Sequence, residues 1–300
     1  MVRRVLFAAL VAAVAAVSVP GQSQEAHGPV RLTLLHTNDT HSRIEPFAAG
    51  NGAYSGKGGI ARRAALVKKL RSQLDHVLLL DAGDVFQGTP YFNRYKGALD
   101  YQLMSMVGYD AVTLGNHDFD NGVDALVAAM KEANFPFVNC NFDMSGAPAL
   151  AARVKPWLVK SFPGLKVGIT GVGVDFKGLV APRNHQGVIW KDPVASLLQV
   201  VQHLRDVEKV DMVVVLSHLG FDMKGDAIDD QILARRVPGI DVIIGGHSHT
   251  FLEEPVKITR EGGITTIFQV GFGGVNLGRM DFVFHQGSLK PVEAEAVKVQ

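Results

Sequence analysis

Residues 77–84 read Val-Leu-Leu-Leu-Asp-Ala-Gly-Asp, a short apolar run that is followed at once by two carboxylates. Such a compact aliphatic run is typical of a strand that is buried on both faces. The same arrangement, an apolar run and then Asp, Asn or His, recurs in residues 32–41, 111–118, 213–218 and 242–249. These five segments carry most of the information about the fold and about a candidate site.

Amphipathic stretches separate the apolar runs, and their alternation with strands predicts an α/β fold. The expected strands are 31–36, 77–80, 111–114, 137–139, 166–172, 212–216 and 242–244, and glycine-rich turns connect three more at 265–270, 280–285 and 292–299. Apolar stripes at helical spacing predict three helices. The stripes are Ile60, Ala64, Val67, Leu70 and Leu74, with Arg62, Arg63, Lys68 and Lys69 on other faces; Leu126, Val127 and Met130; and Val194, Leu197, Leu198, Val201 and Leu204.

The polar residues after the five runs are expected to meet at one site, because ligands of open α/β sheets bind beyond the carboxyl ends of the strands. Each loop alone has a simpler explanation. Asp39-Thr-His41 is compatible with a turn, residues 115–118 with a helix cap, and residues 246–249 with a polar loop. Five such loops at equivalent positions favour a shared site over five separate explanations.

The residue types at these positions indicate metal ions. Aspartate and histidine without thiolate suit Zn, Mn, Fe or Co better than Ca or Mg alone. There are more candidates than one tetrahedral ion uses, so we expect two divalent ions that share a carboxylate. The identity of the metal stays open.

Composition limits the partners and the location of the chain. The net charge of +1 gives no indication of a nucleic-acid partner, and the lone Cys140 permits no intramolecular disulfide. Residues 1–23 combine Arg3 and Arg4 with an apolar stretch over 5–19 and a small-residue end, which predicts a signal peptide. We therefore expect a secreted or periplasmic protein without stable membrane insertion; an uncleaved anchor is the alternative.

Taken together, these motifs resemble the 5′-nucleotidase family of calcineurin-like metallophosphoesterases. The resemblance rests on residues 36–41, 81–84, 115–120, 211–220, 237–241, 245–249 and 274–281. It implies a four-layer αββα sandwich over residues 30–300. It also implies one metal held by Asp39, His41, Asp84 and His249, and a second held by Asp84, Asn116, His218 and His247. Asp84 would bridge the ions, and His117 and Asp120 would form a catalytic dyad.

The resemblance further implies an exported phosphohydrolase that acts on nucleotides or related phosphomonoesters by in-line attack of a metal-bound hydroxide. Family members carry a C-terminal domain that stacks the base between aromatic residues, and residues 30–300 are expected to lack it. A separate partner chain or a longer protein would then supply it. Phe47, Phe86, Tyr91, Phe92 and Phe119 lie near the motif loops, where we expect them to pack around the site rather than to sandwich a base.

Alternative functions remain at this point. A cyclic-nucleotide or nucleotide-sugar phosphodiesterase could use the same centre, as could a thiosulfate-ester hydrolase. A non-catalytic exported metal-binding module is the alternative from another class, but it would have no need for His117 and Asp120.

Overall fold

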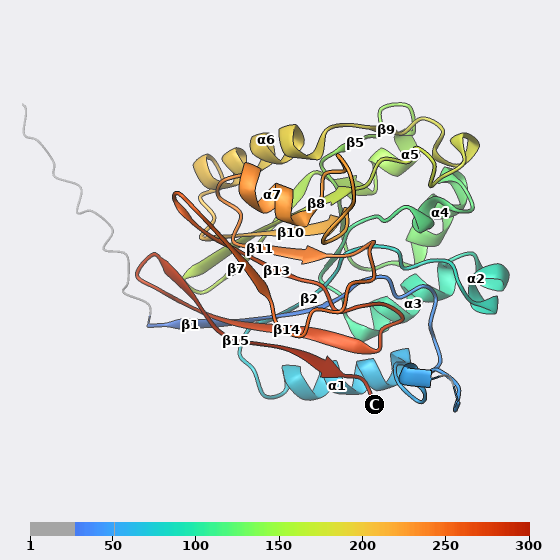
Figure 1. The fold of residues 1–300 in the computed structure, drawn as a ribbon, viewed down its shortest axis with the longest axis horizontal. Helices are drawn as coiled ribbons and strands as arrows, with labels where there is room; N and C mark the ends of the chain where they lie inside the picture. Colours follow the sequence, from blue (N-terminus) through green and yellow to red (C-terminus); the bar gives the residue numbers. More distant parts are fainter. Residues whose placement is uncertain (1–27, 51) are drawn as a thin grey trace, which may run out of the picture.

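The computed structural model describes residues 28–50 and 52–300, so the expected signal peptide lies outside the described residues. The larger of its two main sheets has the strand order β15-β14-β1-β2-β3-β4-β6 (Figure 1). These strands span Ser288–Lys298, Asn276–His285, Val30–Thr37, Val77–Asp81, Ala111–Val112, Phe137–Val138 and Val154–Lys155, respectively. The strands from β1 to β6 are parallel, and β14 and β15 extend the sheet in antiparallel fashion.

The second main sheet has the order β12-β13-β11-β10-β8-β7. Its strands span Val256–Arg260, Gly263–Phe268, Val242–Gly245, Met212–His218, Leu165–Gly173 and Trp157–Phe162. The inner four strands are parallel and the two edge strands are antiparallel to their neighbours. A small two-stranded sheet joins β5 (Phe142–Asp143) to β9 (Ile189–Trp190).

Helices cover the outer face of each main sheet. The longer ones are α1 (Ile60–Arg71), α3 (Ala98–Val107) and α4 (Val123–Ala129) on the first sheet, and α6 (Pro193–Asp206) and α7 (Asp230–Arg236) on the second (Figure 1). The shorter ones are α2 (Pro90–Tyr95), α5 (Pro148–Ala151), η1 (Gly52–Tyr54), η2 (His117–Phe119), η3 (Met130–Glu132) and η4 (Pro182–His185). The predicted four-layer αββα sandwich is confirmed.

Three hydrophobic clusters hold the four layers together. On β1, Leu32 and Leu34 join the cluster between the two sheets, whereas Leu35 joins the cluster between the first sheet and its helices. Val213 and Val215 of β10 likewise face α6 and α7, while Val214 faces the other sheet. Because both faces of each central strand are buried, the strands appear in the sequence as continuous apolar runs.

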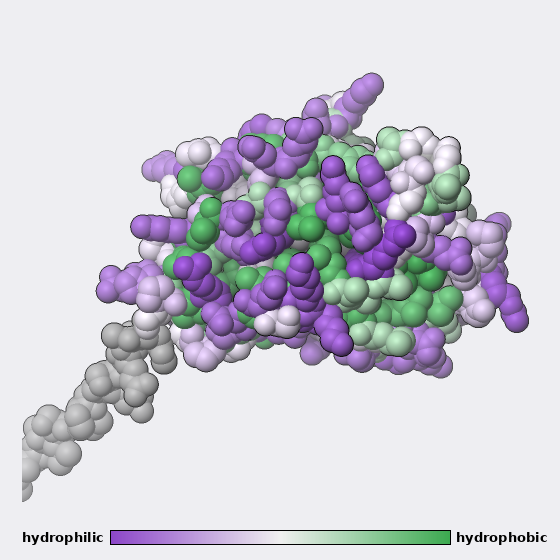
Figure 2. Space-filling view, turned by 90° about the horizontal axis from the view of Figure 1, so that it is seen from below, coloured by the Kyte–Doolittle hydropathy of each residue, from purple (hydrophilic) through white to green (hydrophobic). Residues whose placement is uncertain are grey.

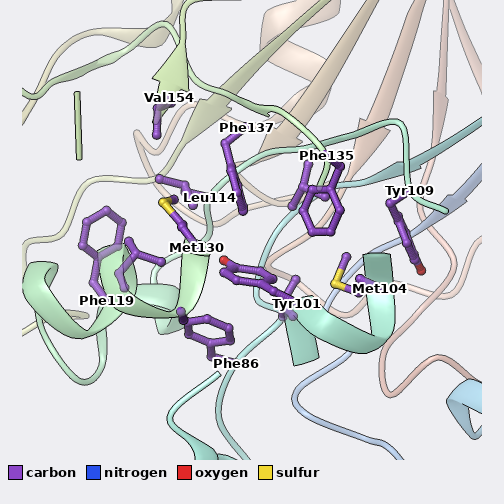
Figure 3. Close-up of a cluster of buried hydrophobic side chains, with 14 of the residues drawn as sticks. Phe86, Tyr101, Met104, Tyr109, Leu114, Phe119, Met130, Phe135, Phe137 and Val154 are labelled. Atoms are coloured by element: carbon purple, nitrogen blue, oxygen red, sulfur yellow. The ribbon is translucent and has the colours of Figure 1, made fainter. Parts of the chain in front are cut away.

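The cluster beneath the first sheet is rich in aromatic side chains (Figure 3). The rings of Phe86 and Tyr101 lie 4.8 Å apart, and Tyr101 meets Phe137 at 5.0 Å in an edge-to-face arrangement. Both geometries fall in the favourable range for aromatic pairs. Phe47, Phe86, Phe92 and Phe119 are buried, as expected for packing residues, whereas Tyr91 is partly exposed and donates a hydrogen bond to Glu45.

Three details of the predicted helices are wrong. Helix α1 ends at Arg71, before Leu74, and Leu198 of α6 is 42% exposed while Val200 takes the buried position. Arg63 was expected away from the apolar face, yet it is buried. Its guanidinium lies against Gly274, and its positive charge lowers the pKa of Asp81 and of Asp100 against the larger opposite effect of their burial.

The surface on the α1 side is mixed, with hydrophilic side chains over most of its area and apolar patches between them (Figure 2). Within residues 28–50 and 52–300, the helices are all too short or too polar to span a bilayer.

Candidate dinuclear metal site

The candidate residues lie at the carboxyl ends of parallel strands from both sheets. Asp39 and His41 follow β1, Asp84 follows β2 and Asn116 follows β3. His218 ends β10, and His247 and His249 follow β11. The arrows of β1, β10 and β11 point to the same end of the molecule in Figure 1. The fold thus brings segments from residue 39 to residue 249 into one cluster.

Two groups of three side chains converge within this cluster. Asp39, His41 and His249 form one group, and Asp84, His218 and His247 form the other; in each, the potential ligand atoms lie within 4.8 Å of one another. The Nε2 atoms of His41 and His249 are 2.9 Å apart, and His218 Nε2 lies 3.0 Å from Asp84 Oδ2. The expected ligand sets also assign Asn116 to the second ion and Asp84 to both ions; these two assignments remain predictions.

Backbone carbonyls orient two of the histidines. His218 Nδ1 lies 2.7 Å from the carbonyl oxygen of Ala82, and His41 Nδ1 lies 3.0 Å from that of Phe86. A carbonyl oxygen only accepts, so Nδ1 carries the proton in both rings and Nε2 is the atom left to face a metal. Metal-binding histidines are commonly fixed in this way.

One buried polar atom supports a metal at this place. Asn116 Oδ1 has no hydrogen-bond partner among the described residues, although it is fully enclosed. A buried polar atom without a partner costs about 1–3 kcal/mol. This oxygen is the atom that the expected ligand set would direct at the second ion, so the residues present fit a bound metal.

The backbone at the site is unusual. Five of the seven expected ligands have positive φ, with values of 49° at Asp39 and His41, 52° at Asp84, 73° at His247 and 53° at His249. Non-glycine residues adopt this region infrequently, and such conformations cluster at functional sites. The loops therefore hold the backbone of these five residues in a conformation that is unfavourable for residues with a side chain.

Burial and neighbouring charges set the ionisation of the cluster. Burial alone would raise the pKa of Asp84, but His218, with His41 and His117, holds it well below its usual range. Burial likewise opposes protonation of His218, yet Asp84 and Asp39 raise its pKa to about 10. The Asp84 carboxylate is therefore ionised and requires positive charge beside it. A divalent cation would take over this role from the His218 proton.

His247 and His249 are neutral at physiological pH. Burial, and then the charge of His218, lowers the pKa of His247 to about 4. Burial, followed by the charge of His41, lowers that of His249 to about 4 as well. Neutral imidazole is the form that binds metals.

His117 and Asp120 form a pair beside the two groups. His117 Nδ1 lies 2.9 Å from Asp120 Oδ2, and this hydrogen bond raises the pKa of His117 against the opposing effect of burial. The His117 ring contacts that of His41 edge to face, with centroids 5.4 Å apart. Helix α4 is preceded by Gly122 and has no side-chain cap, so Asp120 does not serve as its cap.

Sequence reasoning did not find three residues that position the site. The Asp118 carboxylate accepts hydrogen bonds from the backbone N–H groups of Val85, Phe86 and Gly115, which ties two of the loops together. Asn38 donates to Asp39 Oδ2 at 2.6 Å, and Asn184 donates to the carbonyl oxygen of Asp120 at 2.7 Å. Asn38 and Asp118 lie inside the motif loops, so their position in the sequence could have indicated a role at the site. Asn184 lies in η4, outside every motif, and nothing in the sequence indicated its role.

The family assignment follows from this arrangement and from a sequence comparison. Residues 32–251 match the model of the calcineurin-like phosphoesterase family. The chain belongs to this family. The matched segment runs from β1 past His249 and so includes both three-residue groups and the His117–Asp120 pair.

Several named relatives are 5′-nucleotidases. The snake venom 5′-nucleotidase of Gloydius brevicauda is 38% identical over 234 residues, which are 76% of this chain and 38% of that protein. The human 5′-nucleotidase is also 38% identical, over 76% of this chain and 39% of its own length. The chain thus spans less than half the length of these relatives. The resemblance to 5′-nucleotidases expected from the motifs is confirmed.

A solved structure shows the same fold. The 5′-nucleotidase precursor from Thermus thermophilus superimposes with a TM-score of 0.80 at 36% identity, over 90% of this chain and 54% of that one. The sulfate thiohydrolase SoxB of the same organism has a TM-score of 0.74 at 18% identity, over 89% of this chain and 56% of that one, which shows the shared fold alone.

Proposed function

We propose that residues 30–300 form the catalytic domain of an exported, dinuclear metal-dependent phosphohydrolase that acts on nucleotides and related phosphomonoesters. The convergence of two ligand groups beside the His117–Asp120 pair carries the proposal. A module that only binds metal needs no such pair. The 5′-nucleotidase relatives support nucleotides as the substrate class.

One set of residues would bind the metal ions, and His117 would transfer a proton. Asp39, His41, Asp84 and His249 would hold one divalent ion, and Asp84, Asn116, His218 and His247 the other. Such a pair supplies an activated water and positive charge for an in-line displacement at phosphorus. The buried loops around Asp118 fix the distances among these side chains before substrate arrives.

His117 is positioned to act on the reacting phosphoryl group. Its Nδ1 is engaged by Asp120, so Nε2 is free to donate a hydrogen bond to a phosphoryl oxygen or a proton to the leaving alkoxide. The backbone N–H of His117 donates to Asp84 Oδ1 at 2.8 Å, which fixes the ring relative to the proposed bridging carboxylate. The hydrogen bond to Asp120 raises the pKa of His117 and so favours its protonated form, and Asn184 donates a hydrogen bond to the backbone carbonyl of Asp120.

A substrate panel tests the function. With Mn²⁺ or Zn²⁺ added, we expect the full-length chain to hydrolyse AMP, GMP, UMP, CMP and p-nitrophenyl phosphate with kcat/KM values within about tenfold of each other, because phosphate recognition by metals and His117 is common to all five. A cyclic nucleotide in the same panel separates a monoesterase from a phosphodiesterase. A preference above about a hundredfold for one base would contradict broad specificity.

Export has its own test. The basic, apolar and small-residue order of residues 1–23 leads us to expect a mature N-terminus between residues 22 and 27. N-terminal sequencing of the protein from the extracytoplasmic fraction checks this. Val11→Asp combined with Val14→Asp interrupts the apolar stretch and should retain the chain in the cytoplasm. An extracytoplasmic protein that still begins at Met1 would overturn the cleavage prediction.

A further inference from the structure

An aromatic surface lies directly beside the proposed metal site. The ring of Phe272 stacks on that of His249, with centroids 5.1 Å apart and an angle of 16° between the planes. Tyr54 meets Phe272 edge to face at 5.1 Å, and Phe251 does so at 6.0 Å. Tyr54 and Phe251 are nearly parallel to one another, at 19° and 5.9 Å. We call Tyr54, Phe251 and Phe272 the aromatic platform.

The platform is anchored to the loops that carry the proposed ligands. Phe251 is two residues beyond His249, and its ring packs on the backbone of Gly271, where a Cβ atom would come within 2.1 Å of the ring. On either side of Phe272, Gly271 accepts a hydrogen bond from the Asn38 side chain and Gly273 donates one to the Asp39 carbonyl oxygen at 2.7 Å. The position of the rings relative to Asp39 and His249 is therefore fixed.

The platform is accessible to a ligand. Phe251 is 40% exposed, and Tyr54 and Phe272 are partly exposed, whereas Phe47 behind them is buried. Exposed aromatic rings that adjoin a buried polar site are typical of ligand-binding surfaces. Tyr54 and Phe251 already contact each other, so they offer a one-sided stacking surface and not a gap for a ring to enter.

We propose that the aromatic platform binds the planar group of the phosphoester, a nucleobase or an aryl ring, while the phosphoryl group lies at the metal site. The proposal rests on the proposed function and adds a recognition element from within residues 30–300. Of the three platform rings, Phe272 contacts His249 directly, and Tyr54 and Phe251 contact Phe272, so the platform extends outward from the proposed metal site. Because every base has a π-face, such stacking favours nucleotides over phosphates without a ring but discriminates little among bases.

The test compares two substrates that differ only in the base. Stacking of one base on an aromatic side chain changes affinity by about 5- to 150-fold. For the full-length chain with Mn²⁺, we expect KM for AMP to be about tenfold lower than KM for ribose 5-phosphate. The ratio of KM for ribose 5-phosphate to KM for AMP should fall to about two or less in Phe251→Ala and in Tyr54→Ala. Phe251→Tyr should retain the wild-type ratio, and kcat should be similar in all of these proteins.

The matched control is Phe162→Ala at the opposite end of the second sheet. Phe162 is also partly buried and also pairs with another ring, that of His76 at 4.9 Å. It should leave the ratio unchanged. Equal effects of Phe251→Ala on the two KM values, which leave their ratio unchanged, would overturn the platform.

A binding measurement separates failure of this proposal from failure of the proposed function. Fluorescence of 2-aminopurine riboside, which carries no phosphate, should be quenched by the wild-type chain and about tenfold more weakly by Phe251→Ala at the same protein concentration. If neither phosphate ester is hydrolysed, the catalytic proposal fails while this measurement still decides the platform. Absence of quenching in the wild type would refute the platform whatever the activity.

Discussion

Asp84→Asn is expected to lower the metal content from about two ions per chain to below one and to reduce kcat/KM by at least about 10³-fold. Asp84 belongs to both proposed ligand sets, so loss of its charge would affect both ions at once. Its carboxylate is buried and ionised, held by His218 on one oxygen and by the His117 N–H on the other. The asparagine amide has nearly the same shape as the carboxylate but no charge, so the variant loses the electrostatic attraction between the carboxylate and the metal ions. Elemental analysis after reconstitution and steady-state kinetics measure the two effects.

Asp81→Asn is the matched control for this variant. Asp81 is the buried aspartate that ends β2, three residues before Asp84, but its oxygens accept from Thr37 Oγ1 and from the Gly83 N–H, and it belongs to neither three-residue group. Its replacement should lower the melting temperature and retain about two ions. Two ions in folded Asp84→Asn would refute the bridging role, and fewer than two in the reconstituted wild type would refute the dinuclear centre.

The central strands and the meeting point of the motifs could be predicted from sequence because the same physical cause produces both. Strands such as β2 and β11 are buried on both faces, so their apolar runs are unmistakable, and their carboxyl ends mark where polar residues converge. Each predicted boundary of these strands lies within about two residues of the observed one, which is the usual uncertainty of such boundaries.

Among the elements that were not predicted are β7, β12 and α3, whose stability does not come from a recognisable apolar pattern. β7 and β12 lie at the edges of the second sheet, and many of their side chains are partly exposed. Backbone pairing with β8 and β13 holds them in place, and no side-chain periodicity records that. Helix α3 buries Asp100 and exposes Met106, which is 79% accessible, so its sequence contradicts the apolar stripe that defines an amphipathic helix.

The candidate site also combines residues that the sequence could indicate with residues that it could not. The proposed ligand residues stand in short local motifs, so they could be proposed from the sequence alone. The aromatic platform combines η1, the loop after β11 and the turn before β14, and its three rings lie up to 218 residues apart in the chain, from Tyr54 to Phe272. The aromatic residues nearest the motifs, such as Phe86 and Phe119, are instead buried in the core. Only long-range packing determines which rings face the site.

His117→Asn is expected to keep both metal ions and to lose about 10²–10⁴-fold in kcat, because general acid–base groups contribute on that order. His117 lies beside the metal groups and is a member of neither. Its backbone N–H, which contacts Asp84, is unchanged by the substitution. Unchanged metal content together with lost turnover therefore separates a proton-transferring role from a structural one. Full activity in this variant would disprove the assignment.

Asp120→Asn is the companion variant that tests how His117 works. The hydrogen bond from His117 to Asp120 raises the pKa of His117, so the wild-type imidazolium persists to higher pH. Without the carboxylate that pKa falls, and the basic limb of the kcat profile should move to lower pH. At acidic pH both proteins hold the proton, so their rates should converge, and the loss should be smaller than in His117→Asn. A loss that is the same at every pH would show that Asp120 only orients the ring, and that protonation of His117 does not limit turnover.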